Sequence, residues 1–178
     1  MTARMSSLDA FTTPRMRAER LRPDHWADLR RMDTDEQMMA MLGGVRDEVG
    51  TADYLARNLK HWAERGFGLW MLRDFQTNTM IGRAVLRHLE IDDVDEVEVG
   101  YGFLPDYWGR GLATEIALTC VRLGLEELRL RSLVAITLTT NRGSRRVLEK
   151  AGLVYERDVL HAGLSHALFR IVNQGVVR

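Results

Sequence analysis

The feature that most constrains the fold of this chain is a short turn with two glycines, residues 108–115, between two regular segments. It follows a run with the two-residue alternation of a strand, and it opens a run with the spacing of an amphipathic helix. Glycines on both sides of Arg110 let the backbone come close to an anion. The first N–H groups of a helix have no partner within it and favour negative charge. We therefore predict a phosphate cradle at residues 108–115.

The spacing of the two glycines limits the kind of phosphate ligand that the cradle can hold. Neither G-x-x-x-x-G-K-[ST] nor G-x-G-x-x-G fits residues 105–113. A mononucleotide or dinucleotide site of the usual kind is therefore disfavoured. When this stretch is taken alone, a glycine-bearing turn without a ligand stays open as the alternative.

The segments on either side of the cradle predict a strand–helix–strand unit. Residues 94–104 alternate, with Glu98 on the face that also carries two glycines. Such glycines weaken a strand unless a ligand approaches its backbone or a bulge bends it. Residues 111–128 have helical spacing, and residues 132–140 are almost wholly apolar, as in a strand covered on both faces. A right-handed crossover would place the cradle at the first strand-to-helix turn.

A second motif, N-R-G-S-R-R-V-L-E-K-A-G-L, begins at Asn141, about thirty residues after Gly111. Asn141 suits the N-cap of the helix that follows, and Ser144 falls in its first turn. Three arginines of this segment would either contact a phosphate of a ligand or form a solvated helix face: Arg142, Arg145 and Arg146.

Together the two motifs resemble the GNAT N-acetyltransferase superfamily. The stretch Y-W-G-R-G-L-A-T-E resembles its pyrophosphate loop, in the variant of the ribosomal-protein-alanine acetyltransferase branch, and the second motif resembles N-x-x-S-x-x-V-L-E-K-x-G-F. The resemblance covers residues 15–172. It implies an α/β fold (α+β mixed sheet) with about seven mostly antiparallel strands, a splayed central parallel pair and about four helices. It also implies acetyl-CoA as the co-substrate.

The resemblance assigns roles to the cradle, to the second motif and to the strand before them. It implies that the pyrophosphate contacts the cradle, and that pantetheine lies against the main chain of the glycine-bearing strand and against Asn141. An N–H group of Phe103 or its neighbour would polarise the thioester carbonyl. The residues expected to bind the cofactor are Tyr101, Gly102, Phe103, Trp108, Gly109, Arg110, Gly111, Leu112, Ala113, Thr114 and Asn141.

Two residues are expected to be catalytic. Attack of an amine on a thioester needs a neutral amine and relief of charge on the departing sulfur. Glu98 would accept the amine proton through a water, and Ser144 would protonate or solvate the thiolate, as matching serines are assigned in the ribosomal-protein branch. Much of the superfamily has a tyrosine acid seven residues after the asparagine, where this chain has Leu148. A purely structural role stays open for both residues. Glu98 could be an exposed carboxylate on a strand, and Ser144 could be a helix residue whose hydroxyl bonds the backbone.

Charge, hydropathy and cysteine content bear on partners and compartment. Lys and Arg number 25, as do Asp and Glu, and this zero formal charge disfavours binding to nucleic acid or to an anionic membrane. No apolar run approaches the ~20 residues that span a bilayer. Cys120 is the single cysteine and falls within a helical pattern, so we expect a small buried residue, no intrachain disulfide and a reducing cytoplasm.

The length of the chain predicts one domain, residues 15–178, after a flexible leader, residues 1–14. The resemblance implies that this domain is an acetyltransferase. Asp24 and Thr51 are expected to cap helices, and Gly66 to end the second of them. Further strands are expected at residues 15–21, 67–73, 80–91, 155–159 and 167–172.

The function that follows is transfer of an acetyl group from acetyl-CoA to a primary amine by direct attack in a ternary complex. The acceptor would be a protein or peptide N-terminus or a small-molecule amine. A catalytically silent acetyl-CoA-binding module, acting as a sensor or interaction partner, would keep the same motifs and stays open. We expect neither nucleic acid nor membrane as a partner, and no metal; a homodimer is left open.

Overall fold

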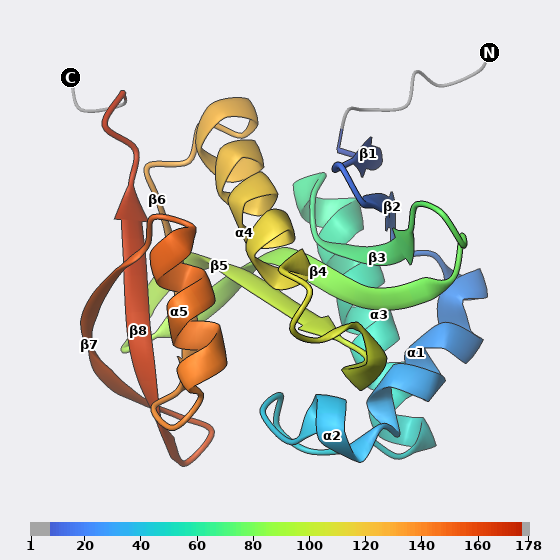
Figure 1. Cartoon of the computed structure of the whole chain (residues 1–178). Helices are drawn as coiled ribbons and strands as arrows, with labels where there is room; N and C mark the ends of the chain where they lie inside the picture. The colour runs from blue at the N-terminus through green and yellow to red at the C-terminus, as the bar shows by residue number, and fades with distance from the viewer. Residues whose placement is uncertain (1–7, 176–178) are drawn as a thin grey trace. The chain divides into compact units, whose positions relative to one another are not determined.

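The structure is a computed structural model, and it describes residues 8–175 of the chain. It has the expected mixed α/β fold, an open and mostly antiparallel sheet in which β5 and β6 are a parallel pair (Figure 1). The strands are β1 (Ala10–Thr12), β2 (Met16–Arg20), β3 (Leu69–Asp74), β4 (Met80–Ile91), β5 (Val94–Phe103), β6 (Ser132–Leu138), β7 (Val154–His161) and β8 (Leu164–Val172). The α-helices are α1 (Trp26–Asp33), α2 (Glu36–Met39), α3 (Glu48–Arg65), α4 (Leu112–Arg122) and α5 (Arg142–Lys150).

The eight strands follow the order β1-β2-β3-β4-β5-β6-β8-β7 in the sheet. The described residues thus hold one strand and one α-helix more than the resemblance implies; the two elements that the sequence did not predict are β1 and α2. The chain divides into two compact units, the first reaching residue 84 and including residues 102–112, the second comprising residues 85–101 and the chain from residue 113. The assignment of residues 15–178 to a single domain stays a prediction.

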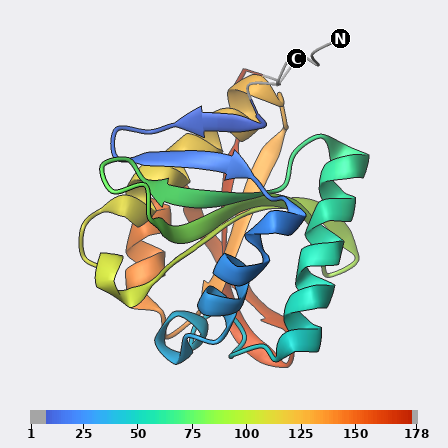
Figure 2. The same cartoon turned by 90° about the vertical axis from the view of Figure 1, so that its right-hand side faces the viewer.

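The first unit begins with three antiparallel strands, β1, β2 and β3, which lie side by side in Figure 2. The alternation predicted for β2 is present, because Met16 and Ala18 are fully buried while Arg17 between them is exposed. The flexible leader is a wrong prediction for residues 10–12, which form β1 and pair with β2 from Ala10 opposite Glu19. Residues 1–7 of that leader lie outside the described residues.

Helices α1 and α3 contact one another in this unit, as Figure 2 shows. Gly66 ends α3 in the left-handed conformation at φ 73°, as predicted. The N-caps predicted for the two helices of this unit, Asp24 and Thr51, are wrong. Asp24 lies in a short 3-10 helix (Pro23–His25) ahead of α1, where it pairs with Arg22. Asp47 caps α3 by accepting from the Gly50 N–H, and Thr51 is buried within that helix.

A buried carboxylate joins three elements of the first unit. Asp33, at the end of α1, is fully buried and accepts from Arg83 of β4 at 2.7 Å, Arg46 at 2.8 Å and the hydroxyl of Thr51 at 3.0 Å. Burial by itself would raise the pKa of Asp33, but the charge of Arg83 and then of Arg46 outweighs it and lowers that pKa. Both guanidinium groups also lie over the ring of Tyr54, at 4.9 and 4.3 Å.

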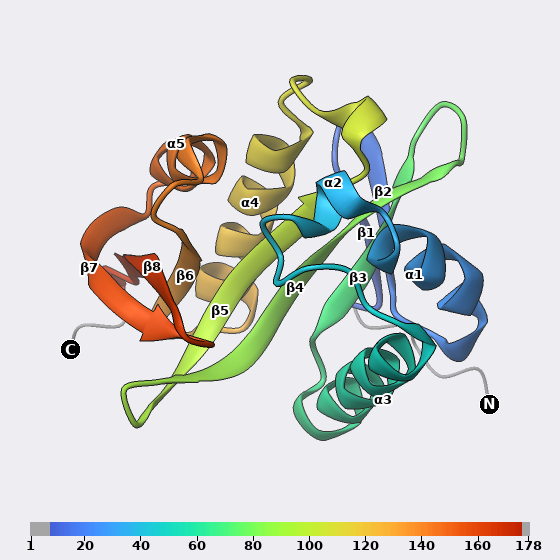
Figure 3. The same cartoon turned by 90° about the horizontal axis from the view of Figure 1, so that it is seen from below.

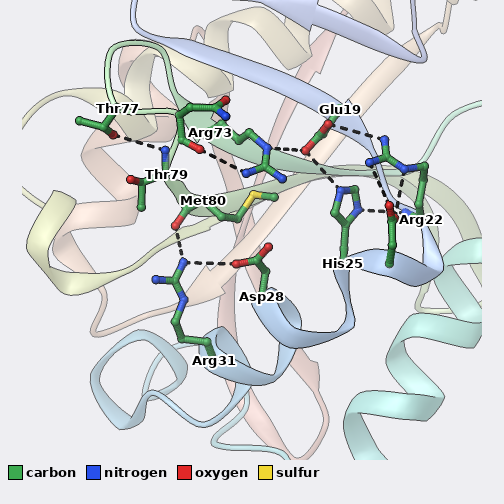
Figure 4. A network of polar contacts seen from close by, with 11 residues as sticks. Glu19, Arg22, His25, Asp28, Arg31, Arg73, Thr77, Thr79 and Met80 are labelled. Carbon is green, nitrogen blue, oxygen red and sulfur yellow. Dashed lines mark hydrogen bonds and ion pairs between the residues drawn. The ribbon is translucent and has the colours of Figure 1, made fainter.

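A second polar network ties β2 and β3 to the start of α1 (Figure 4). Glu19 accepts from Arg73 at 2.7 Å, and its Oε1 lies 3.3 Å from Nε2 of His25. The N–H of Arg22 donates to Nδ1 of His25 at 3.0 Å, so the ring proton lies on Nε2, toward Glu19. The ring of His25 is 2 % exposed, and burial, followed by the charge of Arg22, lowers its pKa.

The second unit holds the strand–helix–strand arrangement predicted around the cradle. Strands β5 and β6 are parallel, with Glu98 opposite Val134, and α4 connects them. The interior of β6 is buried on both faces, as its apolar sequence predicts. Helices α4 and α5 lie on the same side of the strands of this unit (Figures 1 and 3). Helix α4 ends in a π-helical turn (Leu123–Glu127), and β7 and β8 form a hairpin through Ala162 and Gly163.

Candidate active site

The cradle has the backbone geometry that its sequence predicts. Gly109 and Gly111 have φ angles of 71° and 76°, which favour glycine because a Cβ atom would be strained there. Between them, the carbonyl of Arg110 accepts from Nη1 of Arg15 at 2.6 Å, which fixes the loop. Helix α4 begins at Leu112, so the N–H groups of its first turn follow the second glycine directly. An anion can approach these N–H groups without meeting a side chain from either glycine.

The segment before the cradle is held by hydrogen bonds of its own. A 3-10 turn (Pro105–Tyr107) leads to Trp108, whose ring is 52 % exposed and whose Nε1 donates to the carbonyl of Phe103 at 2.7 Å. The N–H of Leu104 donates to Ile81 at 3.0 Å and is therefore not available to a thioester carbonyl. Of the groups predicted to polarise that carbonyl, the N–H of Phe103 itself stays a candidate.

The glycines of β5 accommodate neighbouring side chains. A Cβ at Gly102 would lie 2.8 Å from Leu42 and 3.0 Å from Met38. A Cβ at Gly100 would lie 2.9 Å from Val85 of β4. The distances to Leu42 and Val85 are shorter than real Cβ contacts, so a larger residue at either position would require the neighbouring side chain to shift. Close packing is thus a second reason for glycine at these positions, and the approach of a ligand to this strand stays a prediction.

Glu98 is buried, with 6 % of its surface exposed, and Arg87 of β4 donates through Nε to its Oε2 at 2.8 Å. It is therefore not the exposed strand carboxylate that was the structural alternative. A charge-assisted hydrogen bond of this length orients the carboxylate on β5. The arginine was not predicted from the sequence, although Arg87 and Glu98 lie on strands joined by a short turn.

The second motif forms a small cluster with β5. Asn141 caps α5, as predicted, by accepting from the N–H of Ser144 at 3.0 Å. The phenol oxygen of Tyr101 lies 3.0 Å from Oγ of Ser144 and 3.4 Å from its carbonyl oxygen. Burial raises the pKa of Tyr101 to about 12. Leu148 is buried on α5, so this chain places leucine where much of the superfamily has its tyrosine.

The outer face of α5 borders a pocket of about 660 Å³. Its lining residues are Thr139, Thr140, Arg142, Arg145, Arg146 and Glu149. Arg145 is held there, since its Nη1 donates to the Thr139 carbonyl at 3.3 Å and its guanidinium lies 5.8 Å from the ring centre of Tyr155. Arg142 and Arg146 are exposed, in keeping with the solvated helix face considered for them.

The single cysteine and two of the histidines are further side chains of potential reactivity. Cys120 is fully buried, and burial raises the pKa of its thiol to about 12, as expected of a structural cysteine. The rings of His161 and His166 lie 5.6 Å apart at the β7–β8 turn. Residues 8–175 contain no group of three or more His, Cys, Asp or Glu residues that could hold a metal ion. No helix among them is long and apolar enough to cross a membrane.

Comparison with known proteins gives consistent results. A family model described as an acetyltransferase (GNAT) domain matches residues 15–154. The uncharacterized protein YkkB of Bacillus subtilis (strain 168) is 28% identical over 125 residues, which are 70% of this chain and 73% of that protein. An acetyltransferase structure from Agrobacterium tumefaciens str. C58 superposes with a TM-score of 0.81 at 23% identity, covering 96% of this chain and 98% of that one.

A ribosomal L7/L12 α-N-protein acetyltransferase, solved in complex with coenzyme A, superposes with a TM-score of 0.74 at 15% identity. The match covers 92% of this chain and 97% of that one. At these identities the two structures establish a shared fold only. Membership of the family rests on the match of the sequence to the family model.

Proposed function

Because the chain belongs to the GNAT acetyltransferase family, we propose that it transfers the acetyl group of acetyl-CoA to a primary amine by direct attack in a ternary complex. The observation that carries the proposal is the cradle, in which two left-handed glycines, Gly109 and Gly111, lie within three residues of the start of α4. A pyrophosphate is the doubly charged group that such N–H donors suit. The acceptor is a protein or peptide N-terminus or a small-molecule amine, and the single buried cysteine fits a cytoplasmic enzyme.

In this proposal the cofactor is bound by the cradle, by the main chain of residues 101–103 and by Asn141. Glu98 accepts the proton of the attacking amine through a water, and its buried, arginine-bound carboxylate is fixed for that purpose. Ser144 donates a hydrogen bond to the sulfur as it leaves. Its position in the first turn of α5, next to the Asn141 cap, supports a role for both residues at the same end of the helix.

The cradle is tested by replacing Gly111 with leucine. A side chain at φ 76° is strained, and its Cβ would lie 3.4 Å from Nη2 of Arg15, within the loop proposed to hold the pyrophosphate. We therefore expect acetyl-CoA affinity in calorimetry to fall by at least about 100-fold. Gly66→Leu is the matched control, because Gly66 has a similar φ of 73° and caps α3, outside the cradle. Unchanged affinity in a folded Gly111→Leu variant contradicts the proposed binding mode.

Catalysis is tested separately from binding. Release of free thiol from acetyl-CoA is measured across N-terminal peptides, lysine peptides, polyamines, amino acids and aminoglycosides. An enzyme releases thiol only when its acceptor is present. Tight binding of acetyl-CoA with no thiol release from any amine would instead identify a silent binding module.

A further inference from the structure

The phenol of Tyr101 has no role in the family motifs or in the function proposed above. It extends from β5 to the first turn of α5, where it contacts Ser144 at two atoms, Oγ at 3.0 Å and the carbonyl oxygen at 3.4 Å. The two residues are 43 positions apart in the sequence, and both are only partly exposed. This hydrogen bond links a strand to a helix in a partly buried environment, and it restricts the rotamers of both side chains.

The phenol of Tyr101 has one hydrogen, which can be directed either to Oγ of Ser144 at 3.0 Å or to its carbonyl oxygen at 3.4 Å. The contact with Oγ is the shorter of the two and has the better hydrogen-bond length, so we assign the hydrogen to it. A phenol is also a stronger acid, and hence a better donor, than the alcohol of Ser144. Because burial raises the pKa of Tyr101 to about 12, the phenol keeps its hydrogen throughout the neutral range. With Oγ accepting, the hydrogen of Ser144 is free to point elsewhere.

We infer that Tyr101 is a positioning residue, which directs the hydroxyl hydrogen of Ser144 at the sulfur that leaves acetyl-CoA; this rests on the proposed function. The residue one turn after Ser144 on α5 explains why a phenol from another element would be needed. Leu148 lies one turn after Ser144 and is buried, so α5 itself offers no phenol. Tyr101 brings a phenol to that face from β5 instead.

The chemical step balances without proton loss from Tyr101. The amine nitrogen forms the new bond to the thioester carbon, the carbon–sulfur bond breaks, and sulfur departs with its electron pair as thiolate. The amine proton goes to Glu98 through water. The thiolate accepts a hydrogen bond from Ser144, whose oxygen accepts from Tyr101. Protonation by the phenol is unfavourable, because a pKa of about 12 lies well above the roughly 8.5 of a free thiol.

The first test measures binding and needs no acceptor. The affinities of free CoA and acetyl-CoA are compared by calorimetry at pH 7 and pH 9.5. Only the thiolate of CoA accepts the hydrogen bond from Ser144, so in the wild type the ratio of CoA to acetyl-CoA affinity should rise several-fold with pH. In Tyr101→Phe and in Ser144→Ala we expect this rise to fall below about two-fold, with acetyl-CoA affinity unchanged. A Tyr101→Phe variant that keeps the wild-type rise overturns the inference.

The second test is a double-mutant cycle on kcat. Ser144→Ala and Tyr101→Phe should each lower kcat by about 10-fold without changing KM for acetyl-CoA. If the two residues act as a unit, the kcat of the double variant should be no lower than that of the less active single variant. Tyr155→Phe is the control, since its phenol is exposed and bonds Asp158 on the same strand. Losses that multiply in the double variant show that Tyr101 acts independently of Ser144 and overturn the inference.

The two tests separate this inference from the function on which it rests. A wild type that binds acetyl-CoA but turns over no amine refutes the proposed reaction, and the affinity ratios still decide the role of Tyr101. A wild type that binds neither ligand refutes both. An active wild type whose kcat is indifferent to Tyr101→Phe refutes the inference alone.

Discussion

Two carboxylates on the same face of β5, Glu98 and Glu96, differ in burial and in the arginine that contacts them. Glu98 is buried and accepts from Arg87, whereas Glu96 is partly exposed and accepts from Arg170 at 2.8 Å. Glu98→Gln keeps size and hydrogen-bonding capacity but removes basicity. If Glu98 is the general base, kcat near pH 7 should fall by roughly 10²-fold or more while acetyl-CoA affinity is nearly unchanged. The comparison is made by steady-state kinetics with Glu96→Gln, which should keep wild-type kcat.

The pH dependence of the same variant gives a second readout. An acceptor amine that is already neutral needs no base, so the deficit of Glu98→Gln should shrink as the pH approaches the pKa of the amine. A deficit that stays constant with pH would mean that the substitution disturbs the strand. Full kcat at neutral pH would leave proton removal to water or to backbone carbonyls.

The role of a single residue could be predicted where it depends on the local sequence, and could not be predicted where it depends on a residue distant in the sequence. Gly66 and Asn141 obey the helix-ending and capping rules, and both predictions are confirmed. Thr51 fits the capping rule equally well, yet its hydroxyl bonds the buried Asp33. Asp33 comes from another helix, so neither its burial nor its two arginine partners are visible in the local sequence.

At the scale of elements, the junction of β2, β3 and α1 contains the histidine whose pKa is lowered by burial, His25 (Figure 4). A lowered pKa in the native state means that the unfolded chain binds more protons near pH 6. The stability contributed by neutral His25 is therefore present above about 6.5 and is lost as the pH falls below it. The pKa of Glu19 is lowered too, but from 4.5, so its protonation acts at more acidic pH.

We therefore expect the free energy of unfolding to decrease between pH 7.5 and pH 5.5, and to decrease less in His25→Gln than in the wild type. Urea denaturation at the two pH values measures the difference. His161→Gln, at the β7–β8 turn, is the control and should keep the wild-type pH dependence. An equal decrease in His25→Gln would show that another group is responsible.

Long elements were predictable because periodicity extends over many residues, and short ones were not. Residues 80–91 were predicted as a strand with the bounds that β4 has, and residues 132–140 as the buried strand that β6 is. The three residues of β1 and the four of α2 are too short to show a period. β1 exists because β2 pairs with it, which is a tertiary cause. The contact of Tyr101 with Ser144 likewise depends on the sheet bringing β5 to α5.

For the whole molecule, the set of groups available for proton transfer limits which amine can react. In the proposed chemistry one carboxylate, Glu98, accepts the amine proton, and one hydroxyl, Ser144, donates a hydrogen bond to the sulfur. Such a set suits an acceptor that is easily deprotonated and a leaving thiol that needs little acid assistance.

This limit predicts the class of acceptor. Deprotonating an α-amine of pKa near 7.8 at pH 7 costs about 1 kcal/mol, against about 4.6 kcal/mol for a lysine side chain near 10.4. We therefore expect α-amines of peptides, protein N-termini or small molecules to be acetylated in preference to lysine. Paired peptides decide it, one with a free N-terminus and no lysine, the other blocked at the N-terminus with one internal lysine. Thiol release should be faster with the first at pH 7, and its advantage should narrow as the pH rises, because the lysine then deprotonates. Efficient turnover of the blocked lysine peptide beside an inert free N-terminus would refute the prediction, since a single weak base could not supply the larger deprotonation cost.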